Sequence, residues 1–198
     1  EHHGKYYLYL NRTDWTSNRL EGGGNTRIGL ATSTDLHQWE VDNRGPLLPL
    51  GPPGSWDSVF MMANGAARTP DGKFAITYAG YNGKTWGGIG LATAERPDGP
   101  FIKHLANPVL PAVRGSWERL IHEHTLYRDG DRYLLMYTGF DGTGDQGGLA
   151  ESTDLVHWTK HAQNPVFRRI EPGRFDSVHL RPRSLFRLDG SYYYLFYE

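Results

Sequence analysis

The chain has 198 residues, a formal net charge of −1 and no cysteine. This charge argues against nucleic-acid and membrane-surface partners, which call for a clustered basic excess, and the lack of cysteine excludes disulfides and thiolate metal sites. No apolar run approaches the roughly 20 residues of a membrane-spanning helix. With 38% hydrophobic and 13% aromatic residues, the composition predicts a globular protein with a buried core.

The first segment predicts a strand, a loop and two further short strands. Residues 6–10 alternate Tyr and Leu, which is typical of a strand, and residues 11–26 are mostly polar and Gly-rich, which predicts a loop. Residues 27–33 form a second β-like run, and residues 34–40 predict a turn and an edge strand. Asp35 lies in that turn, as Asp154 does in a similar turn later, and both are interpreted as turn formers.

A longer unit follows and recurs along the chain. Each copy has a first strand, a tight Asp-Gly turn, a Tyr-rich second strand and two further short strands. A hairpin turn needs positive φ, which Gly adopts at little cost. The turns are Asp71-Gly72, Asp129-Gly130 and Asp189-Gly190, and the aromatic-acid pairs that open the copies are Trp56-Asp57, Trp117-Glu118 and Phe175-Asp176.

The copies recur about every 60 residues, which is a repeat period that predicts an array of similar structural units. Four short strands per unit are typical of a β-propeller blade; a β-sandwich also has short strands but does not predict a sequence repeat. We therefore expect an all-β fold, a β-propeller of four-stranded antiparallel blades. The repeat units are approximately residues 1–50, 51–110, 111–167 and 168–198 of one partial propeller domain, about three to three and a half blades, with the remainder supplied by sequence outside this chain.

The innermost strand of each blade lines the central funnel of a propeller, so the first strands were compared by their distance from the leading aromatic residue. By the two-residue period of a strand, the compared positions share one face. Four residues after the leading aromatic residue, the three strands have Phe60, Ile121 and His179. Six residues after it they have Met62, Glu123 and Arg181, and eight residues after it they have Asn64, Thr125 and Arg183.

Glu123 is the unusual residue of this comparison. A carboxylate in the middle of an inner strand must be hydrogen-bonded, paired or functional. One interpretation is a structural Glu123 paired with Arg181 or a neighbouring His. The other is a general acid whose pKa is raised by partial burial. His122 and His124 are expected on the opposite face, so that they form no metal-binding triad with Glu123.

The other predicted site residues are polar groups of the same strands, and we predict no metal ligands among them. His179, Arg181 and Arg183 share one face and suggest recognition of hydroxyls or a carboxylate, with a solvated charged wall as the alternative. The substrate-binding set is Asn64, His122, His124, His179, Arg181 and Arg183. Residues that repeat are assigned to the scaffold: the acids Asp57, Glu118 and Asp176, and Trp56 and Trp117, for which packing is favoured over sugar stacking.

The repeated motifs resemble those of the five-bladed β-propeller glycosidases, most closely glycoside hydrolase family 43 and its relatives in family 32. The motifs are Ile28–Ser33 followed by Thr34-Asp35-Leu36 and Trp39, then Trp56-Asp57-Ser58, Asn164-Pro165-Val166 and the Tyr-rich strand after each Asp-Gly turn. The resemblance implies three catalytic carboxylates on inner strands of successive blades. Glu123 would take the position of the proton donor, Met62–Asn64 supply no carboxylate at the second position, and the first would lie before Glu1.

The resemblance implies a glycoside hydrolase that acts on a plant or microbial oligosaccharide of the arabinofuranoside or xyloside type. It implies no organic cofactor, while a calcium ion on the propeller axis is known in some relatives and is not demanded by any acidic cluster here. Three alternatives stay open. They are a non-catalytic carbohydrate-binding propeller, a phosphorylase-like relative in which the arginines bind phosphate, and a protein-interaction propeller.

Overall fold

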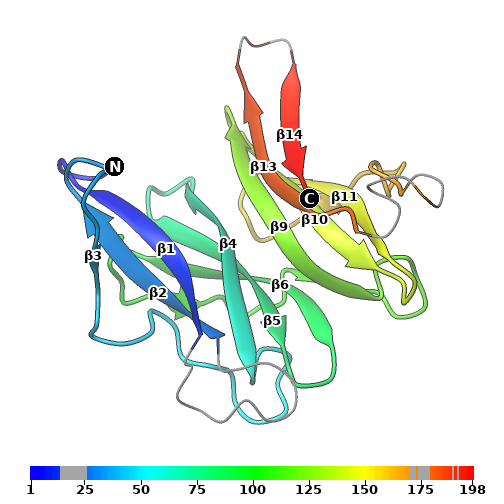
Figure 1. Cartoon of the computed structure of the whole chain (residues 1–198), viewed down its shortest axis with the longest axis horizontal. Helices are drawn as coiled ribbons and strands as arrows, with labels where there is room; N and C mark the ends of the chain where they lie inside the picture. Colours follow the sequence, from blue (N-terminus) through cyan, green and yellow to red (C-terminus); the bar gives the residue numbers. More distant parts are fainter. Residues whose placement is uncertain (14–25, 170–172, 174–178, 189, 191) are drawn as a thin grey trace.

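The computed structural model describes residues 1–13, 26–169, 173, 179–188, 190 and 192–198. In these ranges the chain is all-β, and no helix that could span a membrane occurs among them. The strands form successive antiparallel blades that follow the chain from β1 to β14 (Figure 1). The all-β fold with four-stranded blades is therefore confirmed.

The first two blades contain the strands from β1 to β8. The first has the order β1-β2-β3, and in the second β4, β5, β6 and β7 pair in sequence while β8 also pairs with β6. The bounds are β1 Tyr6–Thr13, β2 Thr26–Ser33, β3 Glu40–Val41, β4 Phe60–Arg68, β5 Phe74–Tyr81, β6 Trp86–Ala94, β7 Ile102–Lys103 and β8 Leu110–Pro111. The loop predicted over residues 11–26 is thus too long at both ends, and residues 14–25 lie outside the described residues.

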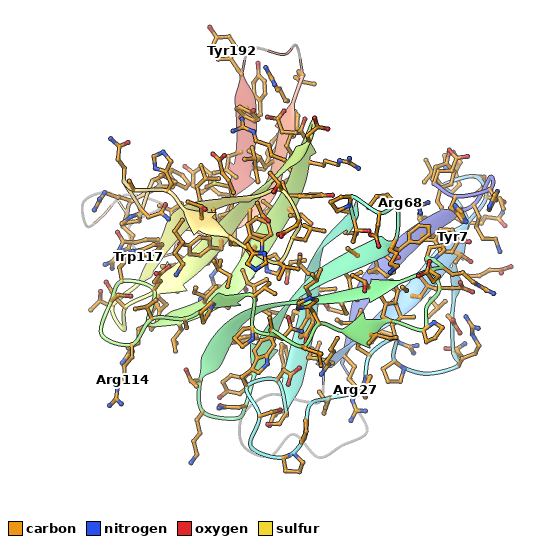
Figure 2. All side chains as sticks on the ribbon, turned by 180° about the vertical axis from the view of Figure 1, so that it is seen from behind. Tyr7, Arg27, Arg68, Arg114, Trp117 and Tyr192 are labelled. Carbon is orange, nitrogen blue, oxygen red and sulfur yellow. The ribbon has the colours of Figure 1, made fainter. Side chains whose placement is uncertain are left out.

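The last two blades contain β9 to β14. β9, β10, β11 and β12 pair in sequence, and β13 pairs with β14. Their bounds are β9 Leu120–Asp129, β10 Arg132–Phe140, β11 Asp145–Ser152, β12 Thr159–Lys160, β13 Pro182–Arg187 and β14 Tyr193–Tyr197. Tyr192 lies at the exposed tip of the β13–β14 hairpin (Figure 2).

The first strands of the blades lie next to one another, as expected for the inner strands of a propeller. β9 contacts β4 on one side and β13 on the other. The approach of β9 to the β4–β5 pair is close at Gly65, where a Cβ atom would lie 2.4 Å from Thr77 Oγ1 and 2.5 Å from Leu126 Cβ. A glycine at this place lets the two blades touch without a gap.

We expect Gly65→Ala to lower the free energy of unfolding by about 2 kcal/mol, because the added methyl group overpacks the contact between the blades. Urea denaturation measures the change. Ala66→Ser, at the exposed neighbouring position, is the control and is expected to change stability by less than about 0.5 kcal/mol. Equal stability of the two variants would show that β4 and β9 separate easily.

The acids that follow the leading aromatic residues hold each blade together. Asp57 Oδ2 accepts hydrogen bonds from the Tyr78 hydroxyl at 3.2 Å and from Lys103 Nζ at 2.5 Å, and Asn107 Nδ2 donates to the Tyr78 hydroxyl at 3.1 Å. The next blade repeats this network through Glu118, Tyr137, Lys160 and Asn164. The scaffold role of Asp57 and Glu118 is confirmed, whereas Asp176 lies outside the described residues.

The repeated tryptophans pack inside the blades. Trp56 stacks on Tyr78 with ring centroids 5.5 Å apart, and Trp117 stacks on Tyr137 with centroids 5.8 Å apart. These contacts favour the packing interpretation. The turn role of Asp154 is confirmed as well, because its Oδ1 accepts the backbone N–H groups of residues 156 and 157, and Asp35 Oδ1 accepts those of residues 37 and 38.

Candidate active site

A β-bulge in β9 brings His122 and Glu123 together. His124 pairs with Tyr137 and Ile121 with Gly139, so that two residues of β9 oppose the single residue Thr138 of β10. A bulge of this kind interrupts the alternation of side chains and re-aims them. As a result, His122 Nδ1 contacts Glu123 Oε2. The expectation that His122 projects away from Glu123 is therefore wrong, and its cause is this extra residue.

The bulge of β9 lies closer to its leading aromatic residue than the bulges of β4 and β13 do to theirs, so the comparison by distance from the aromatic residue is wrong for β9. In β4 the extra residue is Asn64, between the pairs of Ala63 and Gly65, and in β13 it is Arg183. The compared positions consequently do not share one face. Ile121, for example, is fully buried in the core of its blade, although it was placed on the same face as Glu123.

Asp145, at the start of β11, is the centre of the charged cluster, and the comparison of inner strands did not include it. Its Oδ2 accepts hydrogen bonds from Arg181 Nε at 2.7 Å and His179 Nδ1 at 2.8 Å. Its Oδ1 lies 3.3 Å from His122 Nε2. The Asp145 side chain is only 1% exposed, so these three nitrogen groups replace the water that a carboxylate otherwise needs.

Glu123 occupies the more open side of the same cluster. Its side chain is 14% exposed, its Oε2 contacts His122 Nδ1, and its Oε1 lies 3.6 Å from Arg181 Nη1. Arg181 therefore bridges Asp145 and Glu123, because its Nε binds the first and its Nη1 faces the second. Glu123 is thus paired with Arg181 and with a neighbouring His. This is the arrangement expected from the structural interpretation of Glu123 in the sequence.

The charges in this cluster determine its protonation. Burial raises the pKa of Glu123, but the hydrogen bond from His122 and the charges of His122 and Arg181 outweigh it and lower the pKa to about 2. For His122, burial lowers the pKa, but Asp145 and Glu123 outweigh it and raise the pKa above the ordinary value. The prediction of a raised pKa for Glu123 is thus wrong. At neutral pH, Glu123 is therefore ionised, and the raised pKa of His122 favours the protonated form of that ring.

The structure brings four of the predicted residues together and leaves three apart from them. His122, Glu123, His179 and Arg181 meet at Asp145. His124 is 2% exposed and forms a hydrogen bond with Thr77 Oγ1 at 2.9 Å, and burial lowers its pKa to about 4. Arg183 pairs with Glu198, and Asn64 lies in the β4 bulge with its Oδ1 buried and unpaired within the described part of the chain.

One signal in the sequence points to Asp145. It pairs with Phe140 at the start of β11, and the corresponding pair in the preceding blade joins Tyr81 to Trp86. A comparison of third strands would therefore have shown an acid where the other blade has Trp86. In the structure the Trp86 ring packs beside His122, with centroids 6.0 Å apart. Among the described residues, no group of three or more His, Asp or Glu side chains is arranged to hold a metal ion.

Neither a protein-family model nor a curated protein matches the chain, but solved structures do, and several of them are described as glycoside hydrolases or glycosidases. One, described as a BT0996 RGII complex, has a TM-score of 0.74 and 19% identity over 100% of this chain and 63% of its own. A second, described as a glycoside hydrolase, has a TM-score of 0.77 and 18% identity over 100% of this chain and 59% of its own. The family 32 β-fructofuranosidase BmSUC1 of Bombyx mori has a TM-score of 0.70 and 20% identity over 96% of this chain and 38% of its own.

The chain thus spans less than two thirds of the length of each of these proteins. The resemblance to family 43 stays a prediction. At 18 to 20% identity the likeness is one of fold, and the chain is built from the β-propeller blades that these glycoside hydrolases share.

Proposed function

We propose that this chain is part of a glycosidase that hydrolyses a glycosidic bond of a plant or microbial oligosaccharide, of the arabinofuranoside or xyloside type. The observation that carries the proposal is the position of Glu123. It is a partly exposed carboxylate on an inner strand, in contact with a buried His whose pKa is raised by the carboxylates around it. The fold shared with glycoside hydrolases agrees with this chemistry.

Cleavage of a glycosidic bond needs a proton on the leaving oxygen. Glu123 by itself is ionised at neutral pH, but coupled groups hold and release protons as a pair, and in the proposed mechanism His122 and Glu123 share one proton. In the proposed step the His122 Nδ1–H bond breaks as a Glu123 Oε2–H bond forms, and Glu123 passes this proton to the leaving oxygen. His122 is left neutral and regains its proton from water.

Hydrolysis also needs a second carboxylate, as base or nucleophile. Asp145 is unsuited to this role, because it is enclosed by His122, His179 and Arg181 and is only 1% exposed. We propose that the second carboxylate and the remainder of the propeller come from sequence outside this chain. The exposed side chains of Tyr194 and Phe196 lie on one face of β14 and offer an apolar surface for packing against a further blade.

The arginines argue against a phosphorylase-like reaction. A phosphate site needs cationic groups whose charge is not already neutralised. Here Arg181 and His179 bind Asp145, and Arg183 binds Glu198. Sugar hydroxyls, by contrast, need hydrogen-bonding groups and no excess of positive charge. The cluster therefore fits a neutral sugar with water as the nucleophile better than it fits phosphate.

The test is an assay of the full-length protein on aryl arabinofuranosides, xylosides, galactosides and fructosides, with and without inorganic phosphate. We expect release of the aryl group from at least one sugar at a rate independent of phosphate. Turnover that requires phosphate would instead identify a phosphorylase. Sugar binding without turnover would indicate a carbohydrate-binding propeller, and neither binding nor turnover would favour a protein-interaction propeller.

A further inference from the structure

Asp145 is a buried carboxylate that the proposed reaction does not use, and its partners come from separate parts of the chain. His122 belongs to β9, Asp145 to β11, and His179 and Arg181 precede β13. A buried carboxylate is costly unless several donors satisfy it. Three donors on one carboxylate, converging from two blades, indicate that Asp145 orients the groups around it.

The His122 ring is held on both sides. Its Nε2 lies 3.3 Å from Asp145 Oδ1, and its Nδ1 contacts Glu123 Oε2. A carboxylate on one ring nitrogen fixes which way the ring faces and which proton the other nitrogen presents. If the Asp145 contact were lost, the ring could turn, and its Nδ1 proton would no longer be directed at Glu123.

The charges that face this pair come from β11, the segment before β13 and the end of the chain. From β11 Asp145 faces His122, and from the segment before β13 Arg181 faces Glu123 while His179 binds Asp145. Glu198, at the end of the chain, lies 3.9 Å from Arg181, and on β9 itself the buried His124 is the next titratable group. Of the two carboxylates that contact His122, Asp145 is the more deeply buried.

We propose that Asp145 is a positioning residue that holds His122 in its protonated form with Nδ1 directed at Glu123, in an Asp145–His122–Glu123 relay. The relay spans a bulged inner strand and the third strand of the same blade. It rests on the proposed glycosidase function for its role in catalysis, whereas its effect on His122 is a property of the folded protein and is measured separately.

The experiment compares Asp145→Asn with Asp131→Asn in the full-length protein. Asp131 is exposed in the β9–β10 turn, so its substitution makes the same chemical change away from the cluster. Each protein is titrated by NMR of the histidine rings, with the His122 signal assigned by its absence in His122→Gln. The pH dependence of kcat/KM is measured on the best aryl glycoside.

In Asp145→Asn we expect the titration midpoint of His122 to move to lower pH, because an attractive negative charge is lost. The alkaline limb of kcat/KM should move with it. The rate above that midpoint should fall by about tenfold for each pH unit that the midpoint moves. Asp131→Asn should leave both curves unchanged.

The outcomes separate the two proposals. If the His122 midpoint stays unchanged in Asp145→Asn, the relay is overturned, whether or not the protein cleaves sugars. If the midpoint moves but no sugar is cleaved by any form of the protein, the relay stands and the glycosidase function fails. If Asp145→Asn does not fold, the protonation state of His122 is measured by NMR in the unsubstituted protein at pH 7. A doubly protonated His122 ring whose Nε2 proton is protected from exchange supports the relay, and a neutral ring overturns it.

Discussion

Glu123→Gln is expected to lower kcat/KM on the best substrate by about 10²- to 10⁴-fold, the range for loss of general acid catalysis. The amide has nearly the same shape as the carboxyl group but cannot pass a proton from His122 to the leaving oxygen. Steady-state kinetics on a glycoside whose leaving group has a high pKa measure the loss. Glu151→Gln is the matched control, because Glu151 is a half-exposed partner of Arg132 outside the cluster, and it should keep the parent rate.

Because the low pKa of Glu123 is also compatible with a base or a nucleophile, the activity loss of Glu123→Gln is compared between substrates with different leaving groups. A phenol of low pKa leaves without protonation of the glycosidic oxygen. Glu123→Gln should therefore lose much less activity on glycosides of such phenols than on glycosides with poor leaving groups. An equal loss on all leaving groups would contradict the general-acid role and would assign the ionised Glu123 to the base or nucleophile. Unchanged activity on every substrate would make Glu123 a structural partner of Arg181.

Trp117→Ala is expected to lower the free energy of unfolding by about 3 to 5 kcal/mol, the usual cost of removing a large packed aromatic side chain. The indole stacks on Tyr137 and lies against two glycines. A Cβ atom at Gly139 would be 2.4 Å from Trp117 Cζ3, and one at Gly148 would be 2.7 Å from its Cη2. The space left by alanine is therefore bounded by backbone, which closes poorly around a cavity.

Urea denaturation at constant m value measures this effect. The control is Trp39→Ala, whose side chain is exposed in the first blade, with an expected change of about 1 kcal/mol or less. A Trp117→Ala protein that unfolds like the parent but binds sugar more weakly would reverse the assignment, and would place Trp117 at a sugar-stacking surface.

The repeated scaffold could be predicted from the sequence because equivalent residues pack against one another within each blade. Trp56 stacks on Tyr78, which donates to Asp57, and Trp117 stacks on Tyr137, which donates to Glu118, so equivalent residues recur at similar spacing. The turns at Asp71-Gly72 and Asp129-Gly130 follow from positive φ at Gly72 and Gly130. Such features depend on neighbours within one unit, which the repeat itself displays.

The candidate site depended on features that only the tertiary structure contains. A bulge is an extra residue relative to a partner strand, so the alternation of β9 alone could not show that His122 and Glu123 face each other. Asp145 acquires its role because β9, β11 and the segment before β13 converge on it. By itself the sequence determined the blades and singled out Glu123, since these depend on local pattern. The fold decided the protonation of Glu123, because that depends on charges brought together from distant segments.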